Sequence, residues 1–515
     1  MWKDENGFNH LTPKTKTLKR LFENDHDEKK VVFRHGHIAI TNYRMGDNKE
    51  FEKSLSTFDE IRWKYNPVGF YYVKPMRELR INRGYDIHML KKFFPNHKFV
   101  VDNDAYEYKK RDIKLRTGPR DDFQKVALTF MAGEGRYKAN KNYTQILIDS
   151  DTGSGKLWCG VSMIAYHSSN AVVIVPFTKL LGQWEQSLKD FTDLKSDDIM
   201  IVQGSKACLK IIDGKYKHVK VFIFMVDTLS SFEAQYGPIK TMELLEATRA
   251  YLKIIDEVHL DIKAVAMIEA LSNFRMNFYM SASPGRTASK ENWIFKTLFY
   301  NVPKFGSNYK MQVEKHLNII IKQYKFMPDP IQMKSVINPR KKWLNTKAYE
   351  TALFNASDQQ RASFEQALLQ MLNWIKKQIK PEFKVLILCN TIEGTEYLRS
   401  VAERIFPGEC SRYYGTMTSK QEKEDALKQR VICATSSSLG TGADIKGLQF
   451  CINTCTYSSK IEAIQVSGRL RKLPNDPVAY IELVNVGWYK TMKQFEKRKP
   501  TLISRSRTNK LLIIE

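Results

Sequence analysis

The sequence predicts an α/β protein in which two tandem parallel-sheet domains follow a small N-terminal α+β module. Near-continuous runs of Val, Ile and Leu recur along the chain, and such runs are typical of strands buried on both faces of a parallel sheet. Most runs are separated by segments long enough for a helix, which is the rhythm of an α/β fold. The runs form two sets, separated by a proline-bearing stretch (325–343) and a long helical stretch (346–380).

The N-terminal part changes pattern several times, which is typical of a small mixed module. Residues 1–30 are polar and charged, so we expect a loose tail, followed by a module over 31–110. "VVFRHGHIAITN" predicts a strand pair, and "NKEFEKSLSTFDEIRWKY" predicts an amphipathic helix with Phe51, Leu55 and Phe58 on one face. "GFYYVK" and "LRINRG" predict a hairpin, "DIHMLKKFF" a short helix and "HKFVVD" a last strand.

The aromatic and basic side chains of this module can be interpreted in two ways. Those of "RWKYNPVGFYYVKPMRELRINR" could grip a nucleic acid, because aromatic rings between basic residues suit stacked bases and phosphates. We also expect most of these aromatic residues to build the core of the module itself.

The two sets of apolar runs place the two larger domains at 111–310 and 311–487, followed by a basic extension over 488–515. The first set comprises "QILID" (145–149), "AVVIVP" (171–176), "IMIVQ" (199–203), "KVFIFMV" (220–226), "YLKIID" (251–256) and "NFYMSAS" (277–283). The second set comprises "KVLILC" (384–389), "RVICATS" (430–436), "QFCINTC" (449–455) and "AYIELVNV" (479–486).

Composition narrows the classes of function. The 515 residues include 82 Lys and Arg against 56 Asp and Glu, a net charge of +26, which favours a polyanionic partner bound with counterion release. A generally basic surface without a target is the alternative. No long uncharged apolar run and no signal-peptide core is present, so we expect no membrane association and a cytoplasmic location. The seven scattered cysteines predict reduced core residues and no structural metal.

A phosphate-binding loop is indicated by "QILIDSDTGSGK", where a strand runs into a loop with Gly153, Gly155 and Lys156. The following "LWCGVSMIAYH" can be helical. Glycines let backbone N–H groups surround phosphate oxygens, the helix N-terminus adds its positive end, and the lysine reaches the terminal phosphates. Ser150 stands where the motif usually has its first glycine, and Leu157 where a hydroxyl residue usually follows the lysine.

Two adjacent carboxylates complete this pattern a hundred residues later, in "IIDEVHL". Asp256 and Glu257 end an apolar strand, at the edge of the sheet where ligands bind in open α/β folds. Asp256 can hold a magnesium ion through its water shell, and Glu257 can orient and deprotonate an attacking water.

Taken in order, these motifs resemble those of the superfamily 2 helicases. "GPRDDFQ" resembles the adenine-reading motif, "SDTGSGK" motif I, "VPFTKLLGQW" motif Ia, "DEVH" motif II and "SAS" (281–283) motif III. In the second domain "LCNTIEGTEYL" resembles motif IV, "TSSSLGTGADIKGL" motif V and "QVSGRLRK" motif VI. The resemblance covers about 111–490 and implies two RecA-like motor domains that bind ATP and Mg²⁺ in the cleft between them. His259 of motif II would relay the nucleotide state.

The resemblance also implies a set of site residues. Its nucleotide-binding positions are Arg120, Gln124, Thr152, Gly153, Ser154, Gly155, Lys156, Leu157, Gly442 and Asp444. Its catalytic positions are Lys156, Asp256, Glu257, Gln465, Arg469 and Arg471, with Asp256 on the magnesium. The expected nucleic-acid contacts are Thr178, Lys179, Thr391 and Thr435, and the first three could instead be ordinary loop or cap residues.

Motif VI departs from the usual form. The common pattern has a second arginine seven residues after the glutamine, whereas here position 472 is lysine and Arg471 lies one residue earlier. An arginine finger is worth roughly 10³–10⁵ in rate, and lysine does not reproduce its planar geometry. We expect Arg469 to contact the γ-phosphate and Arg471 to act as the finger. The alternative is that Arg471 and Lys472 only face nucleic acid or solvent.

Within the superfamily, the chain most resembles the phage branch-migration helicases of the UvsW type, which have a small N-terminal α+β module, compact motor domains and a DE-x-H motif II. This resemblance implies a monomeric, ATP-dependent DNA helicase that unwinds or remodels branched DNA in replication, recombination or repair. The basic segment 488–510 could hold a duplex arm or be a solvated extension.

Three other functions remain open from the sequence. The motor motifs do not identify the sugar, so an RNA helicase is the first alternative. The second is an ATP-dependent clamp with impaired hydrolysis, because Leu157 cannot coordinate magnesium as a hydroxyl does, although water can fill that position. The third is translocation along duplex without strand separation, which the lack of large insertions between motifs disfavours.

Overall fold

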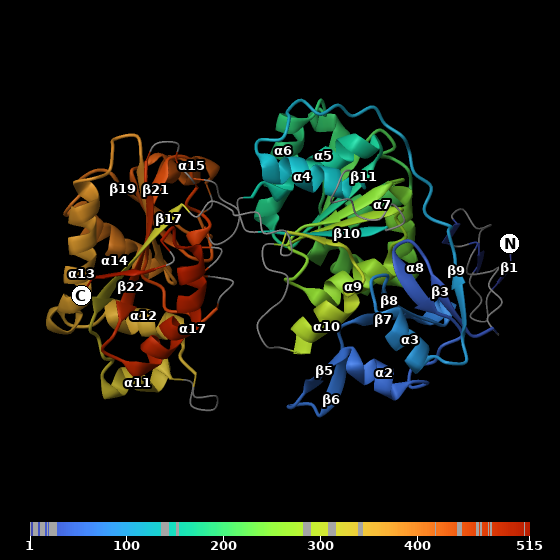
Figure 1. Ribbon diagram of the computed structural model, residues 1–515, viewed down its shortest axis with the longest axis horizontal. Helices are drawn as coiled ribbons and strands as arrows, with labels where there is room; N and C mark the ends of the chain where they lie inside the picture. Colours follow the sequence, from blue (N-terminus) through green and yellow to red (C-terminus); the bar gives the residue numbers. More distant parts are fainter. Residues whose placement is uncertain are drawn as a thin grey trace. The chain divides into compact units, whose positions relative to one another are not determined.

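The computed structural model divides into two compact units, Met1–Met311 and Gln312–Glu515 (Figure 1). It describes residues 2–3, 9–10, 16–17, 19, 28–134, 144–150, 154–281, 290–306, 316–337, 343–417, 419–439, 445–459, 463, 466–471, 473, 476–508 and 510–514. Each unit is built on a seven-stranded parallel sheet flanked by helices. This arrangement confirms the predicted fold of two tandem RecA-like domains with a small α+β module at the N-terminal end.

The sheet of the first unit has the order β12-β13-β11-β14-β15-β10-β16, and every pairing is parallel. All six strands predicted in this domain are present, and a short edge strand, β16, is added. The bounds are β10 (Gln145–Asp149), β11 (Ala171–Val175), β12 (Ile199–Val202), β13 (Val221–Met225), β14 (Leu252–Ile255), β15 (Met276–Ser281) and β16 (Lys304–Phe305).

Helices cover both faces of this sheet, and alternate residues of each strand pack to opposite sides. Leu147 joins one apolar cluster, whereas its neighbours Ile146 and Ile148 join the other. Helices on the second side are α4 (Asp122–Met131), α5 (Lys156–His167) and α6 (Thr178–Phe191). Helices on the first side are α7 (Gly204–Ile212), α8 (Val226–Ala247), α9 (Ile262–Leu271) and α10 (Lys290–Leu298).

The N-terminal module contains a mixed sheet of order β7-β8-β4-β3-β9. The strand pair, the later hairpin, the short helix and the last strand all occur where the sequence predicts them, and most of the tail over 1–30 lies outside the described residues. The bounds are β3 (Lys30–Phe33), β4 (His37–Ile40), β7 (Phe70–Val73), β8 (Glu78–Asn82), β9 (Lys98–Val101), α2 (Lys49–Ser54) and α3 (Ile87–Phe93).

The prediction of one amphipathic helix across 48–65 is wrong. Only α2 is helical, and the chain then forms a separate hairpin of β5 (Ser56–Asp59) and β6 (Lys64–Pro67). Phe51 and Leu55 are buried as expected, but Phe58 lies on the hairpin and is exposed. Helical spacing of these three side chains was misleading, because Phe58 pairs across the hairpin with Tyr65 instead of joining the core.

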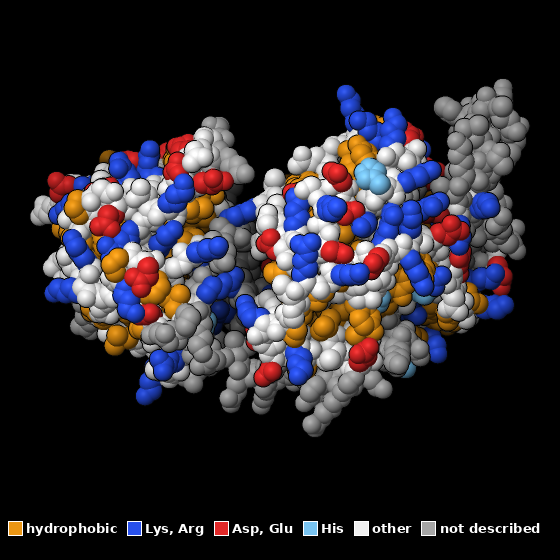
Figure 2. Space-filling view, turned by 90° about the horizontal axis from the view of Figure 1, so that it is seen from above, with side chains coloured by type: hydrophobic (Ala, Val, Ile, Leu, Met, Phe, Trp, Pro, Cys, Tyr) orange, Lys and Arg blue, Asp and Glu red, His pale blue; other side chains and the backbone are white. Residues whose placement is uncertain are grey.

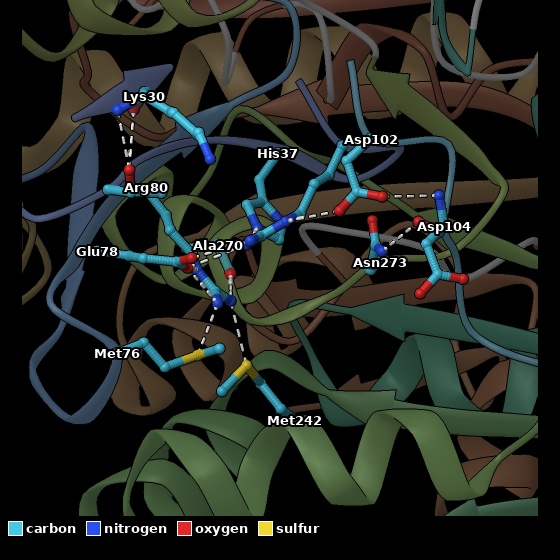
Figure 3. Close-up of polar contacts among 12 residues, drawn as sticks. Lys30, His37, Met76, Glu78, Arg80, Asp102, Asp104, Met242, Ala270 and Asn273 are labelled. Atoms are coloured by element: carbon cyan, nitrogen blue, oxygen red, sulfur yellow. Dashed lines mark hydrogen bonds and ion pairs between the residues drawn. The ribbon is translucent and has the colours of Figure 1, made fainter. Parts of the chain in front are cut away.

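A buried polar network joins the module to the end of α9 (Figure 3). The Glu78 carboxylate accepts hydrogen bonds from Arg34 at 2.9 and 3.0 Å and from Arg80 Nε at 2.7 Å. Arg80 Nη1 also donates to the Ala270 carbonyl oxygen at 2.9 Å, and His37 Nδ1 lies 3.0 Å from the Ser272 carbonyl oxygen. The apolar cluster that contains Leu147 also extends from β3 through the module to α8, α9 and α10. The module and the first parallel-sheet domain therefore share one core.

The second unit has a parallel sheet of order β19-β20-β18-β21-β22-β17-β23. Four of these strands were predicted, and three were not: β17, β19 and β23. The bounds are β17 (Leu317–Tyr324), β18 (Lys384–Cys389), β19 (Cys410–Tyr413), β20 (Val431–Thr435), β21 (Leu448–Asn453), β22 (Val478–Asn485) and β23 (Leu512–Ile514). Its helices include α11 (Pro330–Val336), α12 (Thr346–Phe354), α13 (Asp358–Lys376), α14 (Ile392–Glu403), α15 (Lys420–Lys428) and α17 (Tyr489–Arg505).

The basic segment that begins at 488 is part of this second unit. Its helix α17 packs against β17 and β22, and β23 then pairs with β17. Arg498 is buried and its Nε donates to Glu482 at 2.7 Å, so this cation stabilises the fold, whereas Lys493 and Lys497 are exposed.

The face shown in Figure 2 carries many basic side chains. In the face shown in Figure 2, Lys and Arg side chains are spread over each unit with acidic side chains among them. All seven cysteines are free thiols, and all but Cys410 are buried. No helix in the described part of the chain is long and apolar enough to cross a membrane.

Candidate nucleotide site and nucleic-acid contacts

The phosphate loop follows β10 and ends at the first turn of α5. Gly155 is the N-cap of α5, with φ of +90°, a left-handed conformation that favours glycine. The Ser150 and Ser154 hydroxyl oxygens are 2.7 Å apart, so a serine in the first-glycine position closes the loop through its side chain. The buried Lys156 ammonium donates to the Ser150 carbonyl oxygen. Thr152 and Gly153 lie outside the described residues.

Gln124 lies directly against this loop. Asp121 caps α4 by accepting from the Gln124 backbone N–H at 3.0 Å. The Gln124 side chain accepts from the Arg120 N–H at 2.6 Å and donates to the Gly155 carbonyl oxygen at 3.4 Å. A Cβ at Gly155 would lie 2.2 Å from Gln124 Nε2, so glycine is required there for space as well as for conformation. Arg120 itself is exposed and pairs with Asp121.

The two carboxylates follow β14, which is separated from β10 by only β15 in the sheet. Asp256 is buried and accepts from Trp184 Nε1 at 3.0 Å and from the Glu257 N–H at 2.9 Å. Burial and the adjacent Glu257 raise the pKa of Asp256 to about 6, against the opposing influence of Trp184 and the Lys156 ammonium. A carboxylate in this environment gains from a bound cation, because the cation offsets the cost of burying the charge.

Glu257 and Ser281 both lie close to His259. Glu257 has φ of +49°, which is uncommon for a residue with a side chain and occurs at sites where the surroundings enforce it. Its Oε2 lies 3.5 Å from His259 Nδ1, and this same nitrogen lies 2.7 Å from Ser281 Oγ at the end of β15. The rest of motif III, 282–283, is outside the described residues.

Leu157 is half-buried on the first turn of α5 and packs against the apolar cluster beneath α4, α5 and α6. Its side chain is therefore used in packing. A side chain that packs against the apolar cluster thus occupies the position where the motif usually has a hydroxyl residue.

In the second unit, Arg469 is buried, and none of its three guanidinium nitrogens has a hydrogen-bond partner in the part of the chain that the structure describes. Burial lowers its pKa to about 10, Cys451 acting in the opposite direction. A buried guanidinium without an anion is costly, which favours a site for a negatively charged ligand. Arg471 is exposed. Gly442, Asp444, Gln465 and Lys472 lie outside the described residues.

The four expected nucleic-acid contacts lie at or just after the ends of strands. Thr178 and Lys179 begin α6, with Thr178 exposed. Thr391 caps α14 by accepting from the Gly394 N–H at 3.1 Å, and its hydroxyl donates to Glu350 at 2.8 Å. Thr435 ends β20, is buried and donates to Ser438 at 2.8 Å.

Sequence reasoning missed two side chains that hold these motifs in place. Trp184 fixes Asp256 from α6, and it lies in the quoted motif Ia segment, where no role was assigned to it. Glu350 of α12 accepts from the backbone N–H groups of Asn390 and Thr391 at 2.7–2.8 Å, and burial raises its pKa to about 7. No local signal in the sequence connects Glu350 with motif IV.

Comparison with known families agrees with this arrangement. Residues 108–286 match the family model described as type III restriction enzyme, res subunit, and residues 365–472 match the helicase conserved C-terminal domain. A search of curated proteins gives no match. Two RecA-like domains with a phosphate loop and paired carboxylates are typical of nucleotide-dependent motor proteins. The two matches, in this order along the chain, indicate an ATP-dependent nucleic-acid helicase of superfamily 2.

Proposed function

We propose that this protein is an ATP-driven DNA motor that unwinds or remodels branched DNA, by fork regression or branch migration, in replication, recombination or repair. The observation that carries the ATPase part is that Gln124 and Lys156 both bind the phosphate loop, through the carbonyl oxygens of Gly155 and Ser150, near the buried Asp256. The net charge of +26 and the N-terminal module support a DNA partner.

The residues present fit ATP. The backbone N–H groups at the start of α5 and Lys156 would bind its phosphates, and Gln124 would recognise the adenine. Glu257 would orient the attacking water and accept its proton, and Arg469 would offset charge on the transferred phosphoryl group. Closure of the motor around nucleotide would couple this chemistry to movement along a strand.

The site also fits a magnesium ion. Magnesium takes oxygen ligands and keeps several waters, so Asp256 is a suitable partner, directly or through water. When bound, the ion would neutralise charge on the β- and γ-phosphates.

Leu157→Thr is expected to change the rate of ATP hydrolysis by less than about fivefold, because water can complete the magnesium shell. It is expected to lower the free energy of unfolding by about 1 kcal/mol, because the packed leucine side chain is lost. ATPase rates over a range of Mg²⁺ concentrations and thermal unfolding check both values. A gain of a hundredfold would instead support a clamp whose hydrolysis is impaired by Leu157.

The protein would contact mainly the phosphates of the strand, so its binding would be independent of base sequence. We propose Thr178, Lys179, Thr391 and Thr435 as contacts. The hydroxyl and the backbone N–H of Thr391 both donate to Glu350, and the Thr435 hydroxyl donates to Ser438, so a phosphate contact at either residue would replace a bond within the protein, whereas Thr178 is exposed.

The function is tested by measuring ATP hydrolysis with forked DNA, linear duplex and a matched forked RNA at one salt concentration. We expect the forked DNA to stimulate hydrolysis most. Glu257→Gln is the matched control, because it should lower the stimulated rate about 10²–10⁴-fold while nucleotide binding remains. Equal stimulation by forked RNA would contradict the DNA assignment, and equal stimulation by linear duplex would contradict the preference for branches.

A further inference from the structure

The hairpin β5–β6 places large apolar side chains in solvent at the edge of the first unit. Ile61 is 89% exposed and Trp63 82%, and Phe58 and Tyr65 are each more than 40% exposed. Figure 1 shows these two strands standing off from the five-stranded sheet of the module, near α10. Exposed aromatic groups of this size favour a binding surface, because burial in the core is their ordinary place.

Three rings of the hairpin form one continuous surface. Phe58 and Tyr65 are opposite each other in the strand register, with ring centroids 5.1 Å apart. Trp63 stands edge-on to Phe58 at 5.6 Å. Trp63 has φ of +49°, a conformation that bulky side chains rarely adopt, so the hairpin tolerates local strain to present this ring.

The turn of the hairpin is fixed by its own hydrogen bonds. Asp59 Oδ1 accepts from the backbone N–H groups of Ile61 at 3.0 Å and Arg62 at 3.2 Å. Such a side-chain-to-backbone turn holds the loop that carries Trp63 in one shape. The rings are therefore ordered before they meet a ligand, which lowers the entropic cost of binding.

Cations surround the three rings. The Lys53 ammonium lies over the Tyr65 ring at 5.4 Å from its centroid, and Arg62 and Lys64 are exposed on either side of Trp63. Aromatic rings interleaved with Lys and Arg are the pattern that binds unpaired nucleotides, with rings for the bases and cations for the phosphates. An apolar protein partner would not need these cations.

The base of the hairpin is anchored to the motor. The Leu55 carbonyl oxygen accepts from the Val68 N–H at 3.1 Å and the Gly69 N–H at 2.8 Å. A Cβ on Gly69 would lie 2.7 Å from Ile294 Cγ2 of α10, so hairpin and helix are in close contact. The helix α10 adds a further exposed tryptophan, Trp293, with the Lys290 ammonium 4.2 Å from its ring centroid.

We infer that Phe58, Trp63 and Tyr65 stack on unpaired bases at the branch of the DNA substrate. This inference rests on the proposed function and names the part of the chain that recognises the branch. In linear duplex each base face is covered by its neighbours, whereas at a branch the stack is interrupted and a base face is available. The hairpin therefore distinguishes branched from linear DNA by stacking, without reading base sequence.

The test measures the dissociation constants of the full chain for forked DNA and for linear duplex. Trp63→Ala is expected to weaken fork binding about tenfold and to leave duplex binding unchanged, since one base stack is worth about that factor. Trp63→Phe should restore most of the loss, because a ring remains. The control is Trp343→Ala, which removes an exposed tryptophan of the second unit and should leave both constants unchanged.

Crosslinking gives an independent readout. With 5-iododeoxyuridine at the unpaired branch position, ultraviolet light should crosslink the DNA to a peptide that contains 58–65. Crosslinks that avoid this peptide, or a Trp63→Ala variant that binds forks as tightly as the unaltered chain, would overturn the inference. If the unaltered chain shows no preference for forks in binding or ATPase, the proposed function fails, and the crosslinked peptide alone then decides the inference about the hairpin.

Discussion

Arg469→Ala is expected to lower the rate of DNA-stimulated ATP hydrolysis by about 10³–10⁵-fold without lowering the stability of the protein. The guanidinium is buried and, within the described residues, has no hydrogen-bond partner, so its removal breaks no hydrogen bond in the folded protein. Without this side chain, folding no longer has to bury an unpaired charge. The melting temperature should therefore stay the same or rise. Steady-state ATPase assays and thermal unfolding of the same preparations check both parts.

A control separates this effect from the general loss of a positive charge. Arg404 lies just after α14, is largely exposed and pairs with Glu365, so Arg404→Ala should leave the hydrolysis rate unchanged. If Arg469→Ala lowers the melting temperature strongly and leaves hydrolysis intact, Arg469 is a structural residue. Arg471→Ala in the same assay tests the expected finger, which is exposed in the structure.

Glu78→Ala is expected to lower the free energy of unfolding of the first unit by about 3–5 kcal/mol. The Glu78 carboxylate lies between the buried guanidinium groups of Arg34 and Arg80, which hold its pKa well below the ordinary value despite its burial. Without it, two buried cations face each other without an anion between them. Urea unfolding of the full chain, followed by circular dichroism, measures the loss.

The matched change is Glu50→Ala on the exposed face of α2, which removes a carboxylate from the same module. It should cost less than about 0.5 kcal/mol, as surface substitutions usually do. A Glu78→Ala variant as stable as this control would show that the network contributes little to the fold.

The predictability of each strand follows from its surroundings. Strands such as β11 and β13 are buried on both faces, so their sequences are nearly continuous apolar runs with distinct ends. β17 was missed because Lys322 interrupts its pattern, although this lysine is buried in the structure. The edge strand β19 is only half-buried and contains Ser411 and Arg412, so its composition gives no strand signal. Helical spacing over 48–65 failed because tertiary pairing decided between two locally acceptable conformations.

The residues of the candidate site also divide into those that the local sequence reveals and those that only the packing of the fold reveals. The loop and the two carboxylates were found because their chemistry requires particular residue types at strand ends, and local order along the chain reveals them. Trp184 and Glu350 act through contacts with residues 72 and 40–41 positions away, which only the packing of a helix against a sheet creates. The sequence could predict that Arg469 contacts the γ-phosphate. It could not predict that the guanidinium is buried without a hydrogen-bond partner among the described residues.

One of the links between the module and the first parallel-sheet domain runs through the short helix α9. α9 begins after Asp261, two residues beyond His259, and ends at Leu271, where Arg80 and His37 hold the carbonyl oxygens of Ala270 and Ser272. A helix of about three turns is a stiff rod on this length scale. We therefore expect a force on the N-terminal module to be transmitted through α9 to the segment that carries Asp256 and Glu257. A module transplanted from another protein would therefore need residues that bind the carbonyl oxygens at this end of α9, as Arg80 and His37 do here.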